Sequence, residues 1–449
     1  MRYDVGRFRR PMRRGVMEQM VSLISLGDGS TLSLDFTTGV LDSRLSFTRA
    51  STATYINSQG YVTTMAAAPT NDPTKARFDH DPTTLAPRGL LVEGASTNLC
   101  EQGQYCWGNG ATQSWARSAQ VHVNSVNGAA GANNVPRIDG PDGGSLTGTS
   151  LFKDSGSTFV RTNINVAVAQ LTTYTFSVYV RAPSGGNPYM RLAAFNGGTW
   201  LNTTGGTTAS GITITNVSGS GSVFNGVPST AWVRIWVTFT TQALQTSATI
   251  AFYPDVDTSN AATMYVWGAQ VEAASGPSSV ILTGASTATR NADNCYADSI
   301  SSWYTQGSGT MLFFGRPTVP STRTMLNFSV GTNVPRIQMY GSTSTDVVCF
   351  LENPSGTGAN IVFPSGTLVN GTAFKSAWAF ETGNHAACIN AGTVATASTS
   401  SPAVPSSGIT RLNIGMRYDG FNQFNGHVIS AKYWPTRLAN ATLQAITTL

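Results

Sequence analysis

Short runs in which apolar and polar residues alternate recur along this chain, and they limit its fold more than any other feature. In the clearest run, residues 174–181, Tyr174, Phe176, Val178 and Val180 share one face of an extended strand and are expected to face a core. Further runs occupy residues 32–36, 190–195, 211–217, 232–239, 248–253, 265–272, 310–316, 325–330, 336–340, 347–351, 374–380 and 412–416. In the run 232–239 one face is aliphatic, and the other carries Trp232, Arg234 and Trp236 and is expected to lie under a second layer or at an interface. Many short strands separated by turn residues predict an all-β protein.

Composition supports this prediction. Charged residues make up 11% of the chain, whereas about a quarter is usual, and glycine occurs 46 times. A length of 449 residues suits two or three domains, each with its own core. We therefore expect two consecutive β-sandwich domains of jelly-roll type after an extended N-terminal anchoring arm.

The net charge of +5 comes from the N-terminus rather than from the body of the chain. Residues 1–14 contain six arginines and one aspartate, which already give a charge of +5. The arginines are Arg2, Arg7, Arg9, Arg10, Arg13 and Arg14. We interpret this segment as a docking arm for an acidic surface on a larger assembly, the alternative being a solvated terminus. Because the remaining residues are neutral overall, we do not expect the folded body to bind nucleic acid.

The cysteines do not form a disulfide framework. They are five in number and widely spaced, at Cys100, Cys106, Cys295, Cys349 and Cys388. We expect them to be reduced, with a pair between Cys100 and Cys106 as the alternative. The sequence shows no signal peptide and no apolar run of membrane-spanning length, so we expect synthesis in the cytoplasm and no membrane partner.

Residues 265–293 mark the boundary between two modules. The first part predicts a strand with Tyr265, Trp267, Ala269 and Val271 on one side and Val266, Gly268, Gln270 and Glu272 on the other. Arg290 lies in a Thr-Arg context that matches that of Arg49, and both arginines are expected to be buried and paired with Glu93 or Glu272, with ligand binding as the alternative. Residues 45–98 would then wrap back against this strand.

Four further motifs carry a family resemblance, in this order: Phe47-Thr-Arg-Ala-Ser51, Gln59-Gly-Tyr-Val62, Ala76-Arg-Phe-Asp79 and Gly89-Leu-Leu-Val-Glu-Gly-Ala-Ser-Thr-Asn-Leu99. With Trp267-Gly-Ala-Gln-Val-Glu272 they resemble the linker sections of tailed-bacteriophage virion proteins. Residues 174–181 and 232–239 resemble strands of carbohydrate-binding modules, and residues 424–446 resemble the last strand and closing helix of laminin-G or concanavalin-like domains. The expected units are an arm (1–44), a β-rich linker section (45–98), a jelly roll (99–293) and a laminin-G-like sandwich (294–449).

No catalytic pattern is present in the sequence. No two of the six glutamates lie in one alternating strand, as a local pair of acid and nucleophile would, and the four histidines are scattered. Nucleophile elbows, zinc-binding helices and phosphate loops are absent. Asp255 and Asp257 start an acidic turn that resembles a calcium loop but lacks its later glycine and acid, so a polar turn is the main interpretation. We expect no catalytic residues and no cofactor.

Aromatic residues in glycine-rich and asparagine-rich stretches are the candidates for sugar binding, because a pyranose ring stacks on a flat aromatic face. These candidates are Trp107, Trp115, Tyr189 and Trp200, with packing in the core or between subunits as the alternative. The resemblance implies a homotrimeric tail fibre or appendage that contacts host-surface glycans. A capsid-decorating head fibre or tail subunit without a ligand is one alternative, and a polysaccharide depolymerase is another.

Overall fold

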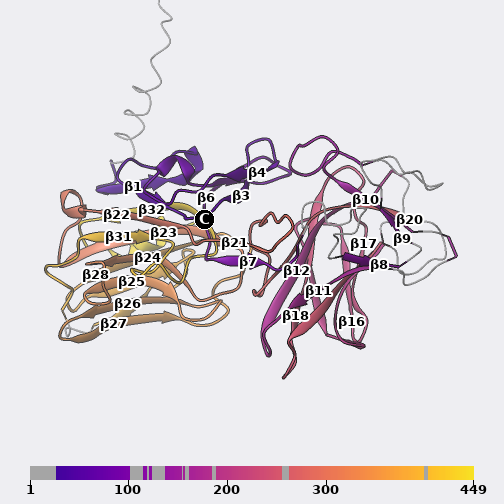
Figure 1. Cartoon of the computed structure of the whole chain (residues 1–449). Coiled ribbons are helices and arrows are strands. Elements are labelled where there is room, and N and C mark those ends of the chain that lie inside the picture. Colours follow the sequence, from indigo (N-terminus) through magenta and orange to yellow (C-terminus); the bar gives the residue numbers. More distant parts are fainter. Residues whose placement is uncertain are drawn as a thin grey trace, which may run out of the picture.

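The computed structural model describes residues 27–101, 115–118, 121–123, 137–153, 155–156, 161–184, 189–254, 262–398 and 403–449. In this part the chain is all-β, and two sandwiches lie side by side (Figure 1). The predicted fold class is thus confirmed for the described residues. A search of the helices in these ranges finds none that is long and apolar enough to cross a membrane.

The first sandwich packs two antiparallel sheets against each other. In the described residues the β18 sheet has the order β15 (Thr203–Thr207), β18 (Val233–Thr240), β12 (Thr173–Arg181), β20 (Ala262–Glu272), β10 (Thr149–Lys153), β9 (Val121–Val123). The β13 sheet has the order β16 (Thr213–Val217), β17 (Gly221–Asn225), β13 (Met190–Asn196), β19 (Ser247–Tyr253), β11 (Thr162–Ala167), β8 (Trp115–Arg117), and β14 (Thr199–Trp200) pairs with β13. Successive strands from β11 to β13 and from β17 to β20 change sheet at each step, as in a jelly roll.

The core of this sandwich follows the predicted alternation. The four predicted core residues of β12 are at most 4% exposed: Tyr174, Phe176, Val178 and Val180. The aliphatic face of β18 (Val233, Ile235 and Val237) packs against the same core. The opposite face of β18 therefore points away from the core, and it carries Arg234 and Trp236.

The second sandwich also has two antiparallel sheets. In the described residues the β32 sheet has the order β30 (Ala395–Ala397), β29 (His385–Ile389), β28 (Phe374–Glu381), β23 (Ser308–Pro317), β32 (Gly426–Trp434), β6 (Pro87–Val92), β5 (Phe78–His80), and β1 (Leu32–Asp35) pairs with β32. The β24 sheet has the order β2 (Ser46–Thr48), β22 (Asn294–Asp298), β31 (Arg411–Ile414), β24 (Arg323–Ser329), β25 (Arg336–Gly341), β26 (Val347–Asn353), β27 (Gly356–Phe363).

Residues from the start of the described chain complete this second sandwich. Strands β1 and β6 hydrogen-bond with β32, and β2 hydrogen-bonds with β22, whereas β5 extends the β32 sheet by pairing with β6. Figure 1 shows β1 and β6 beside the orange and yellow strands. Part of the expected arm and much of the expected linker thus belong to a sheet. The expected unit boundaries stay predictions, but the pairing attaches residues 32–92 to the second sandwich.

Two small ribbons and a few short helices complete the fold. Strand β3 (Ala53–Ile56) pairs with β4 (Val62–Met65), and β7 (Ser96–Asn98) pairs with β21 (Ala288–Arg290) between the sandwiches (Figure 1). The 3-10 helices are η1 (Phe36–Thr38), η2 (Pro73–Lys75) and η3 (Ile300–Ser302). The predicted C-terminal helix is confirmed as α2 (Asn440–Ile446), whose Leu443 is buried against β28 and β29.

One predicted strand face is wrong because β20 contains a bulge. Gly268 has a φ of +65°, and the register between β12 and β20 shifts beside it. An extra residue in one strand reverses which side chains face the core beyond it. Val266 and Ala269 therefore both enter the core, whereas Trp267 packs in a separate cluster at the junction with the second sandwich.

Candidate functional site

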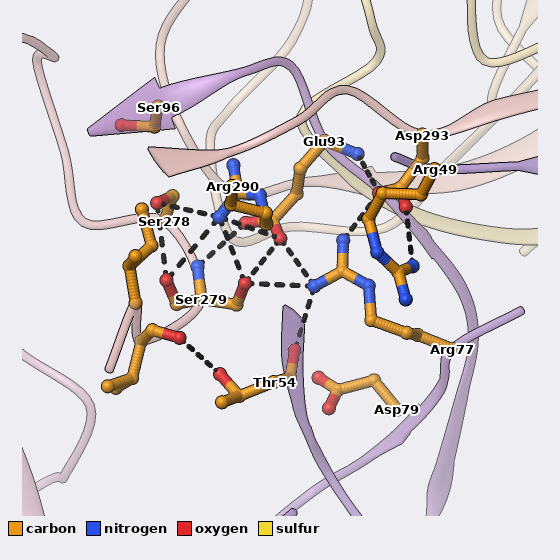
Figure 2. Close-up of polar contacts among 12 residues, drawn as sticks. Arg49, Thr54, Arg77, Asp79, Glu93, Ser96, Ser278, Ser279, Arg290 and Asp293 are labelled. Atoms are coloured by element: carbon orange, nitrogen blue, oxygen red, sulfur yellow. Dashed lines mark hydrogen bonds and ion pairs between the residues drawn. The ribbon is translucent and has the colours of Figure 1, made fainter. Parts of the chain in front are cut away.

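Three arginines are buried at the junction between the two sandwiches. Arg49 and Arg77 are 0% exposed and Arg290 is 1% exposed, so their guanidinium groups are out of contact with bulk water. Figure 2 shows Arg77 between Glu93 and Asp293. Its Nη1 donates to Glu93 Oε2 at 2.8 Å, and its Nη2 donates to Asp293 Oδ2.

The other two arginines close an arginine network around these carboxylates. Arg49 Nη1 lies 3.0 Å from Asp293 Oδ1, and Arg290 Nη1 lies 3.3 Å from Glu93 Oε2. The predicted burial of both arginines and the predicted Arg290–Glu93 pair are confirmed. Arg49 pairs with Asp293 instead of a glutamate. Arg77 was not among the predicted buried arginines, although it belongs to the motif Ala76-Arg-Phe-Asp79.

A third carboxylate joins the arginine network through a serine. Ser278 Oγ lies 2.6 Å from Glu272 Oε2 and 3.0 Å from Arg290 Nη1. With Glu93, Asp293 and Glu272, the network has as many carboxylates as arginines. Such balance is required because an unpaired ion in a low-dielectric interior costs several kcal/mol.

The electrostatic effect of this arrangement appears in two pKa shifts. Burial by itself would raise the pKa of Glu93, but Arg290 and Arg77 outweigh burial and lower it to about 2. Burial would lower the pKa of Arg77, but Asp293 and Glu93 raise it above its usual value. Both groups are therefore charged at neutral pH, and the network serves as a fixed structural joint.

Beside this joint lies a cleft of about 300 Å³ between the outer faces of the β18 and β32 sheets. The wall from the first sandwich contains Tyr179, Trp232 and Trp236. Register places Tyr179 of β12 directly opposite Arg234 of β18, and the Arg234 guanidinium lies 5.6 Å from the centre of the Tyr179 ring. An aromatic wall with an arginine at its centre therefore faces the second sandwich.

Local contacts hold the two tryptophans of this wall in place. Trp236 lies against Gly206 of β15, where an added Cβ would come within 2.3 Å of the indole ring. The glycine thus allows the ring to lie close to its neighbouring strand. Trp232 donates its Nε1 hydrogen to the backbone oxygen of Asp139 at 2.9 Å.

The opposite wall comes from the second sandwich and is more polar. Leu91, His427 and Arg316 lie in one row across β6, β32 and β23. His427 is 3% exposed and its Nε2 lies 2.7 Å from Asp79 Oδ2. Its Nδ1 has no hydrogen-bond partner in the structure. Tyr55 of β3 adds an aromatic ring to this side.

The predicted sugar platforms lie elsewhere or outside the described residues. Trp115 is 5% exposed and its ring packs in the core of the first sandwich rather than on a surface. Tyr189 is partly buried just before β13. Trp200 is partly buried on the outer face of the β13 sheet, with its ring centre 4.3 Å from that of Phe195. Trp107 lies outside the described residues.

The remaining predicted residues are the possible metal ligands, the docking arginines and the cysteines. Asp255, Asp257 and the six N-terminal arginines lie outside the described residues. Within the described ranges, no group of three or more His, Cys, Asp or Glu side chains is placed to hold a metal ion. Cys100, Cys295, Cys349 and Cys388 are buried free thiols, as expected for reduced cysteines, and Cys106 is outside the described residues.

The sequence signal for the cleft was the strand that begins at Trp232. Its alternation predicted a face with two tryptophans and Arg234, placed under a second layer or at an interface. The structure shows that this face borders an interface, with the second sandwich opposite it. The partners Tyr55, His427 and Arg316 come from distant parts of the chain, so local periodicity could not associate them.

No protein-family model matches the chain, and a search of curated proteins finds no match. Among solved structures, the chain is similar to the CBM40 domain of a Ruminococcus gnavus IT-sialidase bound to α2,3-sialyllactose, with 16% identity over 32% of this chain and 84% of that one and a TM-score of 0.30. It is also similar to the CBM22-1 xylan-binding domain of a Paenibacillus barcinonensis protein, with 15% identity, coverage of 40% and 96%, and a TM-score of 0.23.

A third similar structure is that of domains LG4-5 of the mouse laminin α1 chain, with 10% identity over 62% of this chain and 85% of that one and a TM-score of 0.23. These values are too low to support an assignment of function. The chain is therefore described by its own structure. It has two β-sandwiches that a buried arginine network joins, and an aromatic cleft lies between them beside this network.

Proposed function

We propose that this chain is a glycan-binding structural protein without catalytic activity and that the cleft between its sandwiches is the glycan site. One observation carries the proposal. Trp232, Trp236 and Tyr179 of the first sandwich line one wall of the cleft, and Tyr55 and His427 line the opposite wall. Aromatic faces stack on the apolar faces of sugar rings, and polar side chains around them bind the hydroxyl groups.

A binding role fits the state of the carboxylates in the cleft better than glycosidic catalysis does. A general acid needs a raised pKa, whereas the pKa of Glu93 is lowered to about 2. Asp79 accepts hydrogen bonds from the backbone of Ile56 at 2.5 Å and from His427. The contacts of Glu93 and Asp79 with their protein partners therefore stabilise the fold.

The biological setting that we propose comes from the sequence motifs. We propose a homotrimer in a tailed-bacteriophage particle, most simply a tail fibre or appendage whose N-terminal arginines dock onto other virion proteins. Several copies of a weak glycan site would then act together at a host surface. A head fibre or tail subunit without a ligand is the competing proposal.

The test is a glycan array probed with the full chain, followed by titration of the best glycan against two tryptophan variants. We expect Trp236→Ala to weaken binding by about tenfold, the equivalent of about 1.4 kcal/mol. Trp200→Ala is the matched control, because Trp200 is also a partly buried tryptophan on an outer sheet face. Absence of binding to any glycan by the folded chain would favour the ligand-free structural role. Loss of binding in Trp200→Ala alone would move the site to the β13 sheet.

A further inference from the structure

Two arginines of the cleft have no carboxylate partner among the described residues. Arg234 is 6% exposed, yet no described carboxylate lies within ion-pair distance of it. Arg316 is partly buried on β23 and makes no side-chain hydrogen bond or ion pair with the described residues. Buried guanidinium groups are normally paired, because an unpaired desolvated charge is costly.

The hydrogen bonds of Arg234 leave most of its donors unused. Its Nη1 donates to the backbone oxygen of Ser278 at 2.5 Å, and its Nη2 donates to Ser177 Oγ at 2.9 Å. The Nε hydrogen is buried and has no partner in the structure. Since a guanidinium carries five N–H groups, the bonds to the described residues fix its position without saturating it.

The acidic groups that line the same cleft do not neutralise these two arginines. Glu93 lines the cleft, but two arginines of the arginine network already bind it. Asp79 binds His427 and the backbone of Ile56. Arg88, also in the lining, already pairs with Asp81 at 2.7 Å. The cleft therefore keeps an excess of positive charge at Arg234 and Arg316.

We propose that the glycan bound in this cleft is anionic and that its carboxylate or phosphate group binds the guanidinium groups of Arg234 and Arg316. The inference rests on the proposed function and specifies its ligand class. Guanidinium groups bind carboxylates and phosphates through paired charge-assisted hydrogen bonds. The aromatic wall then holds the uncharged face of the sugar beside the anion site.

The experiment measures binding of the full chain to two anionic and two neutral classes of polymer. Hyaluronan and polygalacturonate present carboxylates, and glycerol-phosphate teichoic acid presents phosphates. Dextran and the carboxyl-reduced forms of the first two polymers are neutral. The variants are Arg316→Ala and Arg316→Lys, with Arg411→Ala as the control because Arg411 pairs with Asp298 outside the cleft.

We expect an anionic polymer to bind and its carboxyl-reduced or neutral counterpart to bind at least about tenfold more weakly. Arg316→Ala should cause a similar loss, Arg316→Lys a smaller loss of about threefold, and Arg411→Ala no change. Comparison of the hyaluronan and teichoic acid arms identifies the anion. Binding of neutral polymers with equal strength would overturn this inference and leave the proposed function intact. Anion binding that is unchanged in Arg316→Ala would also overturn it. Binding to none of the anionic polymers would overturn it as well, whereas the proposed function is refuted only by absence of binding on the glycan array.

Discussion

Two groups of arginines meet at the junction between the sandwiches, and they differ in what neutralises them. Arg49, Arg77 and Arg290 are surrounded by carboxylates of the same chain, whereas Arg234 and Arg316 have none within ion-pair distance among the described residues. Burial does not separate the groups, because Arg234 is almost as buried as the first three. The partner decides whether a buried arginine serves the fold or remains available to a ligand.

The largest effect is expected when the arginine network loses its central member. Arg77→Met removes the cation between Glu93 and Asp293 and leaves two carboxylates short of a partner. We expect the free energy of unfolding to fall by about 3–5 kcal/mol, measured by urea denaturation. A loss below about 1 kcal/mol would show that the arginine network does not hold the two sandwiches together.

Acid should weaken the same joint. The pKa of Glu93 in the folded chain is about 2, below its usual value of 4.5, so Glu93 favours the folded state only while it is ionised. Its contribution, on the order of 3 kcal/mol, is complete above about pH 4.5 and is lost as the pH falls toward 2. Denaturation at pH 6 and pH 3 measures this loss. Glu93→Gln should reduce the difference between the two pH values, and an unchanged difference would contradict the assignment.

The corresponding substitution in the cleft should change the free energy of unfolding much less. Arg234→Met removes a desolvated cation that has no carboxylate partner but keeps most of the side-chain volume. We expect the free energy of unfolding to change by less than about 1 kcal/mol in either direction, because two lost hydrogen bonds are offset by the relief of desolvation. A destabilisation as large as that of Arg77→Met, in the same denaturation assay, would remove the distinction between the two groups.

Raising the salt concentration should have the smallest effect on stability, and it separates the two groups of arginines. The arginine network is buried, so raising NaCl from 50 to 500 mM should change the melting temperature by no more than about 2 °C. Affinity for an anionic glycan should decrease over the same range, because salt screens the attraction between the partly buried Arg316 and the approaching ligand. Parallel melting curves and binding isotherms check this. A melting temperature that follows ionic strength steeply would indicate that water reaches the network.

Much of the fold was predictable from local pattern. The strand from Thr173 to Arg181, its core-facing side and the C-terminal helix follow from side-chain periodicity, which is a property of consecutive residues. The predicted core-facing side of β20 is the exception, and side-chain periodicity could not reveal its cause. The positive φ of Gly268 inserts a bulge and sends Trp267 toward the junction rather than the core.

The candidate site was less predictable than the fold. The sequence by itself determined an all-β chain, a tryptophan and arginine face beginning at Trp232, and the burial of Arg49 and Arg290. Only the tertiary structure decided that Arg77 joins these arginines, that β1 and β6 complete the C-terminal sandwich, and that Arg316 and His427 face Trp236 across a cleft. The physical reason is that alternation fixes which side of a strand a residue occupies, whereas pairing of strands hundreds of residues apart fixes what that side meets.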